Sequence, residues 1–187
     1  TSKARQAQSK VKQIKRLESL EVVKSERSGN IRLPEIQKQR GSALECKDLA
    51  VGYPDKVIAR KISFFIPSGA HVAILGDNGQ GKTTFLRTLA NDLQVKAGEF
   101  QWGHQLSIGY YAQHVYQSIN PEFDVYTYLR NVAADSIRDQ EVLDMAGSFL
   151  FSGDDVNKRV KTLSGGERAR LCLAGILLTK HKALLLD

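Results

Sequence analysis

The residues best suited to chemistry form a glycine-rich run, Gly76-Asp77-Asn78-Gly79-Gln80-Gly81-Lys82-Thr83-Thr84. Its glycines allow successive backbone N–H groups to turn inward on phosphate oxygens, and a helix beginning at Lys82 adds partial positive charge at the same point. Lys82 is predicted to reach the β- and γ-phosphates of a nucleotide, and the Thr83 hydroxyl to ligate Mg²⁺. The run therefore predicts a site for a nucleoside triphosphate with Mg²⁺.

A second signal is the run Leu163-Ser164-Gly165-Gly166-Glu167. Ser164 and Glu167 have capping-box spacing, which by itself predicts only the start of a helix. Two glycines in a first helical turn destabilise the helix by about 1 kcal/mol each relative to alanine, so they indicate that a ligand or another backbone approaches closely. Gly165 and Gly166 would leave helix N–H groups and the helix dipole open to a phosphate.

A third signal is the apolar run 184–186, which ends on Asp187. This is the pattern of a buried strand that presents a carboxylate at its C-terminal edge. In P-loop proteins such a carboxylate helps to hold Mg²⁺, usually through water. Any strand can end on Asp, so this signal has weight only together with the other two.

The elements that must position these residues can be read from the apolar periodicity. Strands are predicted at 43–49, 62–66, 71–75 (buried, leading into the glycines), 99–102, 106–111 and 183–186, and helices at 82–91, 125–134, 140–151 and from Ser164 onward. Strands interleaved with helices predict an α/β fold with a parallel sheet at its centre.

Composition narrows the class of protein. With 187 residues, 42% hydrophobic and 25% charged, the chain is expected to form one globular domain with an appendage. Cys46 and Cys172 lie far apart and the four histidines form no pair at metal-ligand spacing, so we expect a reduced, zinc-free, cytoplasmic protein. The longest apolar run, 171–178, is well short of the ~20 residues that cross a bilayer, so no transmembrane segment is predicted.

The positive charge is confined to one end of the chain. Residues 1–40 carry eleven Lys/Arg and four Asp/Glu, whereas residues 41–187 carry sixteen of each. Residues 1–27 contain no Gly or Pro, and the 3-4-3 spacing of their apolar residues predicts a long helix. We therefore expect a basic helical arm at 1–40, an interaction segment with nucleic acid as the commonest partner, and a separate domain at 41–187.

Residues 43–187 resemble the ABC ATPase superfamily. In this resemblance residues 76–84 are similar to its Walker A motif, 163–167 to its signature motif and 183–187 to the start of its Walker B motif. The resemblance implies a P-loop NTPase fold with a mixed sheet, an antiparallel β part and a helical subdomain, and it implies ATP and Mg²⁺ as cofactors. It further implies that Gln113 contacts Mg²⁺ and the attacking water, and that Tyr53 stacks on adenine; taken alone, these would be a solvated loop residue and a packed strand-end aromatic.

Three details resemble the second ATPase domain of the ABC-F branch, whose members are soluble and act on ribosomes. They are the continuation Glu167-Arg168-Ala169-Arg170, the approach at 149–156, and the arm at 2–12, which is similar to the end of the ABC-F interdomain linker. The resemblance implies that the arm reaches rRNA or tRNA. The arm residues that would do so are Lys3, Arg5, Lys10, Lys12, Lys15 and Arg16.

The family resemblance also implies a composite site, in which two ABC domains close head to tail on two ATP molecules. The family places a catalytic glutamate directly after the Walker B aspartate, and the sequence ends at Asp187, so we expect these residues to bind ATP without turning it over. The alternative is the ATP-binding subunit of a membrane transporter, which would share every nucleotide-site residue. Chromosome-handling ATPases of the superfamily insert long coiled coils between Walker A and the signature. Such a protein is disfavoured here because only about eighty residues separate the two motifs.

Overall fold

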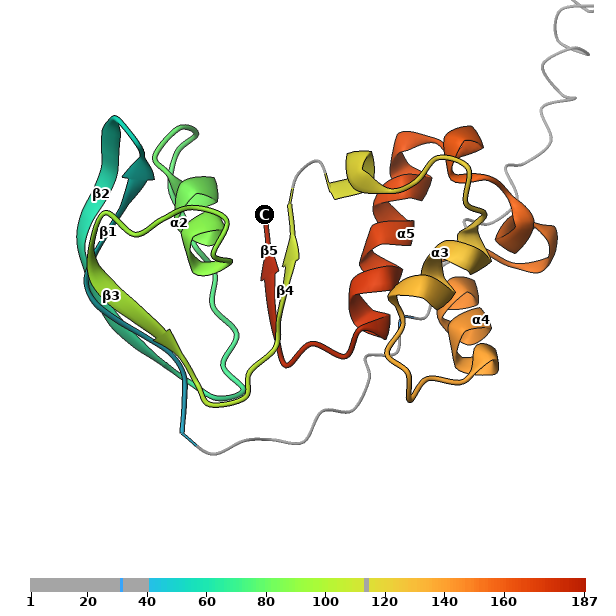
Figure 1. Ribbon diagram of the computed structural model, residues 1–187, viewed down its shortest axis with the longest axis horizontal. Helices are drawn as coiled ribbons and strands as arrows, with labels where there is room; N and C mark the ends of the chain where they lie inside the picture. The colour runs from blue at the N-terminus through green and yellow to red at the C-terminus, as the bar shows by residue number, and fades with distance from the viewer. Residues whose placement is uncertain (1–30, 32–40, 113–114) are drawn as a thin grey trace, which may run out of the picture.

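The computed structural model describes residues 31, 41–112 and 115–187 (Figure 1). The basic arm predicted at 1–40 lies outside the described residues apart from Ile31. The division into an arm and a domain therefore stays a prediction.

The larger sheet is antiparallel and has three strands in the order β2-β1-β3. Strands β1 (Ser42–Tyr53) and β2 (Lys56–Pro67) form a hairpin, and β3 (Ala97–Trp102) pairs with the other edge of β1. Helix α2 (Lys82–Leu89) packs on this sheet. Their shared core, referred to below as the sheet core, consists of residues from β1, α2 and β5, namely Leu44, Cys46, Leu49, Val51, Leu86, Leu89 and Leu185.

The parallel pairing predicted from the sequence is formed by two short strands. Strand β4 (Ile108–Tyr111) pairs in parallel with β5 (Ala183–Leu186), in register from Ile108 opposite Ala183 to Tyr111 opposite Leu186. Figure 1 shows this pair between the antiparallel sheet with α2 on one side and a group of helices on the other. Both strands end at the same edge, which brings residues far apart in sequence together.

The helical body contains α3 (Val125–Val132), α4 (Asp139–Ser148) and α5 (Gly165–Leu178), with the short turns η1 (Val115–Ser118), η2 (Gly153–Asn157) and η3 (Val160–Thr162). It has its own apolar core, referred to below as the helical core, in which Leu129, Val142 and Leu171 are fully buried. The predicted helices are therefore present, each within a few residues of the expected bounds.

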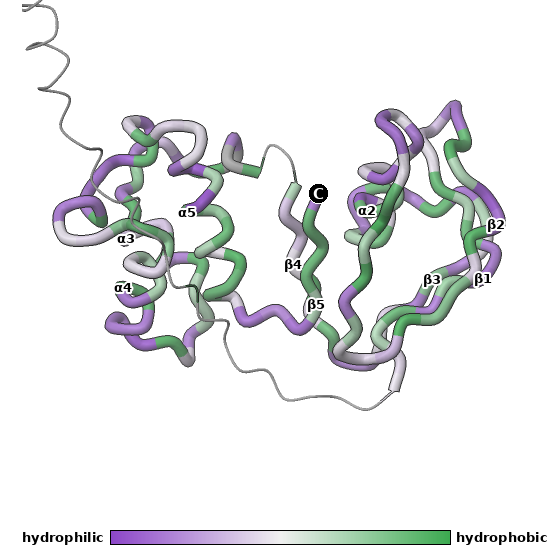
Figure 2. The backbone as a smooth tube through the Cα atoms, turned by 180° about the vertical axis from the view of Figure 1, so that it is seen from behind, coloured by the Kyte–Doolittle hydropathy of each residue, from purple (hydrophilic) through white to green (hydrophobic). Residues whose placement is uncertain are grey.

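One predicted strand is wrong. Residues 70–77 have no regular secondary structure, and within them Val72 is 61% exposed and Leu75 is 89% exposed. The physical reason is the lack of a ladder partner: among the described strands, β5 pairs only with β4, and none pairs with residues 71–75. Figure 2 shows that this segment and β5 both contain apolar stretches.

In the part of the chain that the structure describes, no helix is long and apolar enough to cross a membrane. Over the same residues, no group of three or more His, Cys, Asp or Glu side chains is placed to hold a metal ion. Any metal bound by these residues would therefore need water or a ligand to complete its coordination.

Both cysteines are free and buried, each in a different core: Cys46 lies in the sheet core and Cys172 in the helical core. Burial raises the pKa of each thiol to about 11.

Because the thiolate is the reactive form, iodoacetamide at neutral pH is expected to label both cysteines slowly in the folded protein and rapidly in concentrated urea. Mass spectrometry across a urea series would also tell which core opens first. Rapid labelling of either cysteine without denaturant would contradict the packing.

Candidate nucleotide-binding site

The glycine-rich run forms a loop between the exposed segment 70–77 and α2. Gly79 and Gly81 have φ angles of 83° and 95°, in the left-handed region that favours glycine. A Cβ on Gly81 would also collide with the Ile58 side chain of β2. Gly81 is the N-cap of α2 and provides no side-chain cap, so the first turn of the helix presents backbone N–H groups without a capping acceptor.

Lys82 lies over this loop. Its Nζ donates hydrogen bonds to the carbonyl oxygens of Gly76 and Asp77, each at 2.8 Å. Gln80 Nε2 donates to Asp77 Oδ2 at 3.3 Å, and Asn78 is exposed. Thr84 differs from the other loop residues because it is buried, and its carbonyl accepts a hydrogen bond from a hydroxyl one turn along α2. The loop residues are thus together in space, with the ammonium group at their centre.

Thr83 and Asp187 are brought together from positions 104 residues apart: Thr83 Oγ1 donates to Asp187 Oδ1 at 2.9 Å. The backbone N–H of Asp187 donates to the Tyr111 carbonyl at 3.0 Å, which fixes the main chain of the aspartate at the end of β4. A hydroxyl and a carboxylate are the hard oxygen ligands that Mg²⁺ prefers. The arrangement is therefore chemically suited to Mg²⁺.

A third side chain at this point, Tyr110, was not singled out from the sequence. Its hydroxyl donates to Asp187 Oδ2 at 3.1 Å, so each oxygen of the carboxylate accepts one hydrogen bond. Burial, followed by the Asp187 charge, raises the pKa of Tyr110 to about 12, and the hydroxyl therefore keeps its proton at physiological pH. Parallel strands end at the same edge, and that rule was the only sequence signal that could have placed Tyr110 near Asp187.

Tyr53 is the last residue of β1 and is 40% exposed. Its hydroxyl interacts with the guanidinium of Arg87, in the last turn of α2, which also bonds Asp92 Oδ2 at 2.7 Å. Hydrogen bonding to Asp92, the largest cause, raises the pKa of Arg87. The tyrosine is thereby tied to the helix that follows the loop. Gln113 lies outside the described residues, so its predicted contact with Mg²⁺ and water stays a prediction.

The second motif begins α5. Ser164 and Glu167 form the predicted capping box: the Ser164 N–H donates to Glu167 Oε2 at 2.8 Å, and the Glu167 N–H donates to Ser164 Oγ at 3.3 Å. The first of these bonds is the main reason that the pKa of Glu167 is lowered. At Gly165 and Gly166 an added Cβ would meet no atom of the described residues within 4 Å. Packing against the part of the chain that the structure describes therefore does not explain the two glycines.

The structure does not bring this motif to the glycine-rich loop. Figure 1 shows α2 on one side of the β4–β5 pair and α5 on the other. Lys82, Thr83 and Asp187 thus form one cluster, and Ser164 to Glu167 form a second, separate one.

The family model described as "ABC transporter" matches residues 59–187, which include both motifs and Asp187. The chain is 35% identical, over all of its own length and 35% of the other's, to "Probable ATP-binding protein YbiT" of Escherichia coli O157:H7. It is 32% identical, over 99% of its length and 34% of the other's, to "Energy-dependent translational throttle protein EttA" of Haemophilus influenzae.

A solved structure agrees. The "Putative ABC transporter (ATP-binding protein)" from Pyrococcus furiosus matches with a TM-score of 0.67 and 30% identity, over 77% of this chain and 74% of the other. The chain belongs to the ABC family of ATP-binding domains, and its sequence relatives place it with the ABC-F branch. The predicted family and fold class are thus confirmed. The chain spans about a third of the length of the two curated relatives named above.

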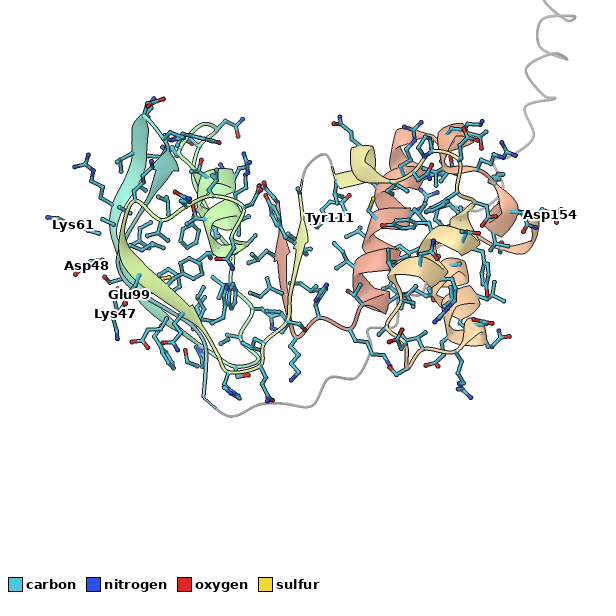
Figure 3. All side chains as sticks on the ribbon, in the orientation of Figure 1. Lys47, Asp48, Lys61, Glu99, Tyr111 and Asp154 are labelled. Carbon is cyan, nitrogen blue, oxygen red and sulfur yellow. The ribbon has the colours of Figure 1, made fainter. Side chains whose placement is uncertain are left out.

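Substitution of Lys82 by alanine is expected to weaken Mg·ATP binding tenfold to a hundredfold, because a charge-assisted contact to phosphate contributes about 1.5–3 kcal/mol. Tyr53→Ala is expected to have a smaller effect through lost stacking on adenine. Calorimetry measures both affinities. Lys47→Ala is the matched control, since Lys47 points away from α2 on the outer face of the sheet (Figure 3). Unchanged affinity in a Lys82→Ala variant with normal circular dichroism would refute the loop as the ATP site.

Proposed function

We propose that the chain is the second Mg·ATP-binding domain, with the end of the preceding linker, of a cytoplasmic ABC-F-type ATPase that acts on the ribosome in translation. The observation that carries the nucleotide part is the meeting of Thr83 and Asp187 beside the glycine-rich loop. The translation part is supported by the similarity to EttA, named as a translational throttle protein, and by the charge of the arm.

The residues present fit Mg·ATP. Lys82 and the uncapped start of α2 offer positive charge to the phosphates, and Thr83 with Asp187 offers hard oxygen ligands to the metal ion. When bound, Mg²⁺ neutralises charge on the β- and γ-phosphate oxygens. Tyr53 would contact the adenine, and Lys82 and Gln113 would be the catalytic groups toward the γ-phosphate and the attacking water.

The separate position of the signature motif supports a composite site. The bare amides of Gly165 and Gly166 and the dipole of α5 suit an anion, yet α5 lies across the β4–β5 pair from the chain's own loop (Figure 1). A second ABC domain bound head to tail would offer its signature to this loop, while Ser164 to Glu167 would serve the partner's ATP. ATP binding would then favour closure of the two domains, and hydrolysis would permit reopening.

A transporter subunit is the second candidate, because the matching family model and the Pyrococcus structure are both described as ABC transporters. The nucleotide site is common to both functions. The gene decides between them: a second ABC domain encoded upstream in the same reading frame supports the ABC-F function, and a neighbouring membrane-spanning subunit supports transport.

The 187-residue chain alone is expected to bind ATP but to hydrolyse it far more slowly than ~1 s⁻¹, the lower end of ordinary enzyme turnover. The 187 residues include neither the catalytic glutamate that the family places directly after the Walker B aspartate nor a second signature motif. Phosphate release with and without the first ABC domain, in a chain extended past Asp187, measures the difference. Turnover at ~1 s⁻¹ by the chain alone would refute the composite site.

The basic arm is expected to bind rRNA or tRNA through backbone phosphates. Reversing Lys10, Lys12 and Lys15 to glutamate should weaken ribosome association and flatten its salt dependence, because each neutralised phosphate contributes about −0.7 to −0.9 to the slope of log K against log salt. Pelleting of the full-length protein with ribosomes across a salt series measures both effects. ATP binding is the control and should be unchanged, since residues 41–187 have balanced charge. Equal pelleting at every salt concentration would favour the transporter function.

A further inference from the structure

The Asp187 carboxylate accepts hydrogen bonds from two other elements. Thr83 of α2 donates to Oδ1 at 2.9 Å, and Tyr110 of β4 donates to Oδ2 at 3.1 Å. The main chain of Asp187 is held by the Tyr111 carbonyl. Two bonds to different oxygens fix the plane of a carboxylate, which one bond does not.

These bonds are compatible with a bound metal ion. A threonine hydroxyl can donate its proton to Asp187 and still offer a lone pair to Mg²⁺, and an ionised carboxylate has about four acceptor positions, of which two are used here. The remaining positions are those available to Mg²⁺ or its water. Their direction is set by the bond that Tyr110 makes.

Tyr110 is itself held in place. It packs against the core shared by β1 and α2, whereas its neighbour Tyr111 packs against the helical core. Its backbone lies in register opposite Leu185 of β5, two residues before the aspartate. The ring therefore has few alternative orientations from which to reach Asp187.

We propose that Tyr110 is a positioning residue for the Mg²⁺ site, whose hydroxyl orients the Asp187 carboxylate toward the metal ion and its water. This role rests on the proposed Mg·ATP function. Asp187 is only partly buried, so water can replace the lost donor when the hydroxyl is removed. Removing it should therefore alter metal dependence more than folding.

The test uses the full-length protein and its affinity for ATP, measured by calorimetry over a range of Mg²⁺ concentrations and again in EDTA. Tyr110→Phe keeps the ring and is expected to need about tenfold more Mg²⁺ for half of the Mg²⁺-dependent gain in ATP affinity, as outer-shell partners of metal ligands typically do. Its ATP affinity in EDTA should equal that of the unsubstituted protein.

Tyr128→Phe is the matched control. Tyr128 is also a half-buried tyrosine with a pKa of about 12, but its hydroxyl interacts with Cys172 in the helical core. It should lower the unfolding midpoint without changing the Mg²⁺ requirement. In an Asp187→Asn background, Tyr110→Phe should have no further effect, because the carboxylate it orients is gone.

An unshifted Mg²⁺ requirement in Tyr110→Phe would overturn this role alone, as would an equal shift in the Asp187→Asn background. An unsubstituted protein whose ATP affinity ignores Mg²⁺ would overturn the proposed function as well. Fluorotyrosine at position 110 gives a readout that keeps the hydroxyl. Its fluorine resonance should shift when ATP is added with Mg²⁺ and not when ATP is added in EDTA; no difference between the two would also overturn the role.

Discussion

The hydrogen bonds to Asp187 join parts of the chain that lie far apart in sequence, in addition to the apolar core that α2 and β5 share. Thr83 lies in the first turn of a helix that packs on the antiparallel sheet, and Asp187 follows a strand of the parallel pair. The bond between them closes a chain segment of more than a hundred residues, and the helical body lies within that segment. The position of the loop relative to β5 therefore depends on a polar contact as well as on apolar packing.

The two apolar cores have different parts in this arrangement. The sheet core carries the loop, Lys82 and Tyr53, and the helical core carries the start of α5. Each motif is well formed by itself: Gly79 and Gly81 meet the conformational needs of the loop, and the reciprocal bonds of Ser164 and Glu167 define the first turn of α5. Their separation across β4 and β5 is consistent with an ATP site completed by two domains.

Elements that depend on a few neighbouring residues were predicted best from the sequence. The strand Ala183–Leu186 and the capping box of α5 were predicted at the residues where they occur, because apolar runs and cap spacing act over a few neighbours. The family was also predictable, since its motifs have fixed spacing. The segment 71–75 was not, because an apolar run becomes a strand only beside another strand. Tyr110 was missed for a related reason: its role depends on which residue faces it from β5.

Neighbouring residues on β4 face opposite ways, Tyr110 toward the sheet core and Tyr111 toward the helical core. The side chains of these two adjacent residues thus pack against different cores. Figure 3 shows Tyr111 between the β4–β5 pair and the helical body. Side chains on opposite faces of a strand move in opposite directions when the strand rotates about its own axis. A rotation of β4 that moved the Tyr110 hydroxyl would therefore displace the Tyr111 ring in the opposite direction, where it packs against the helical core.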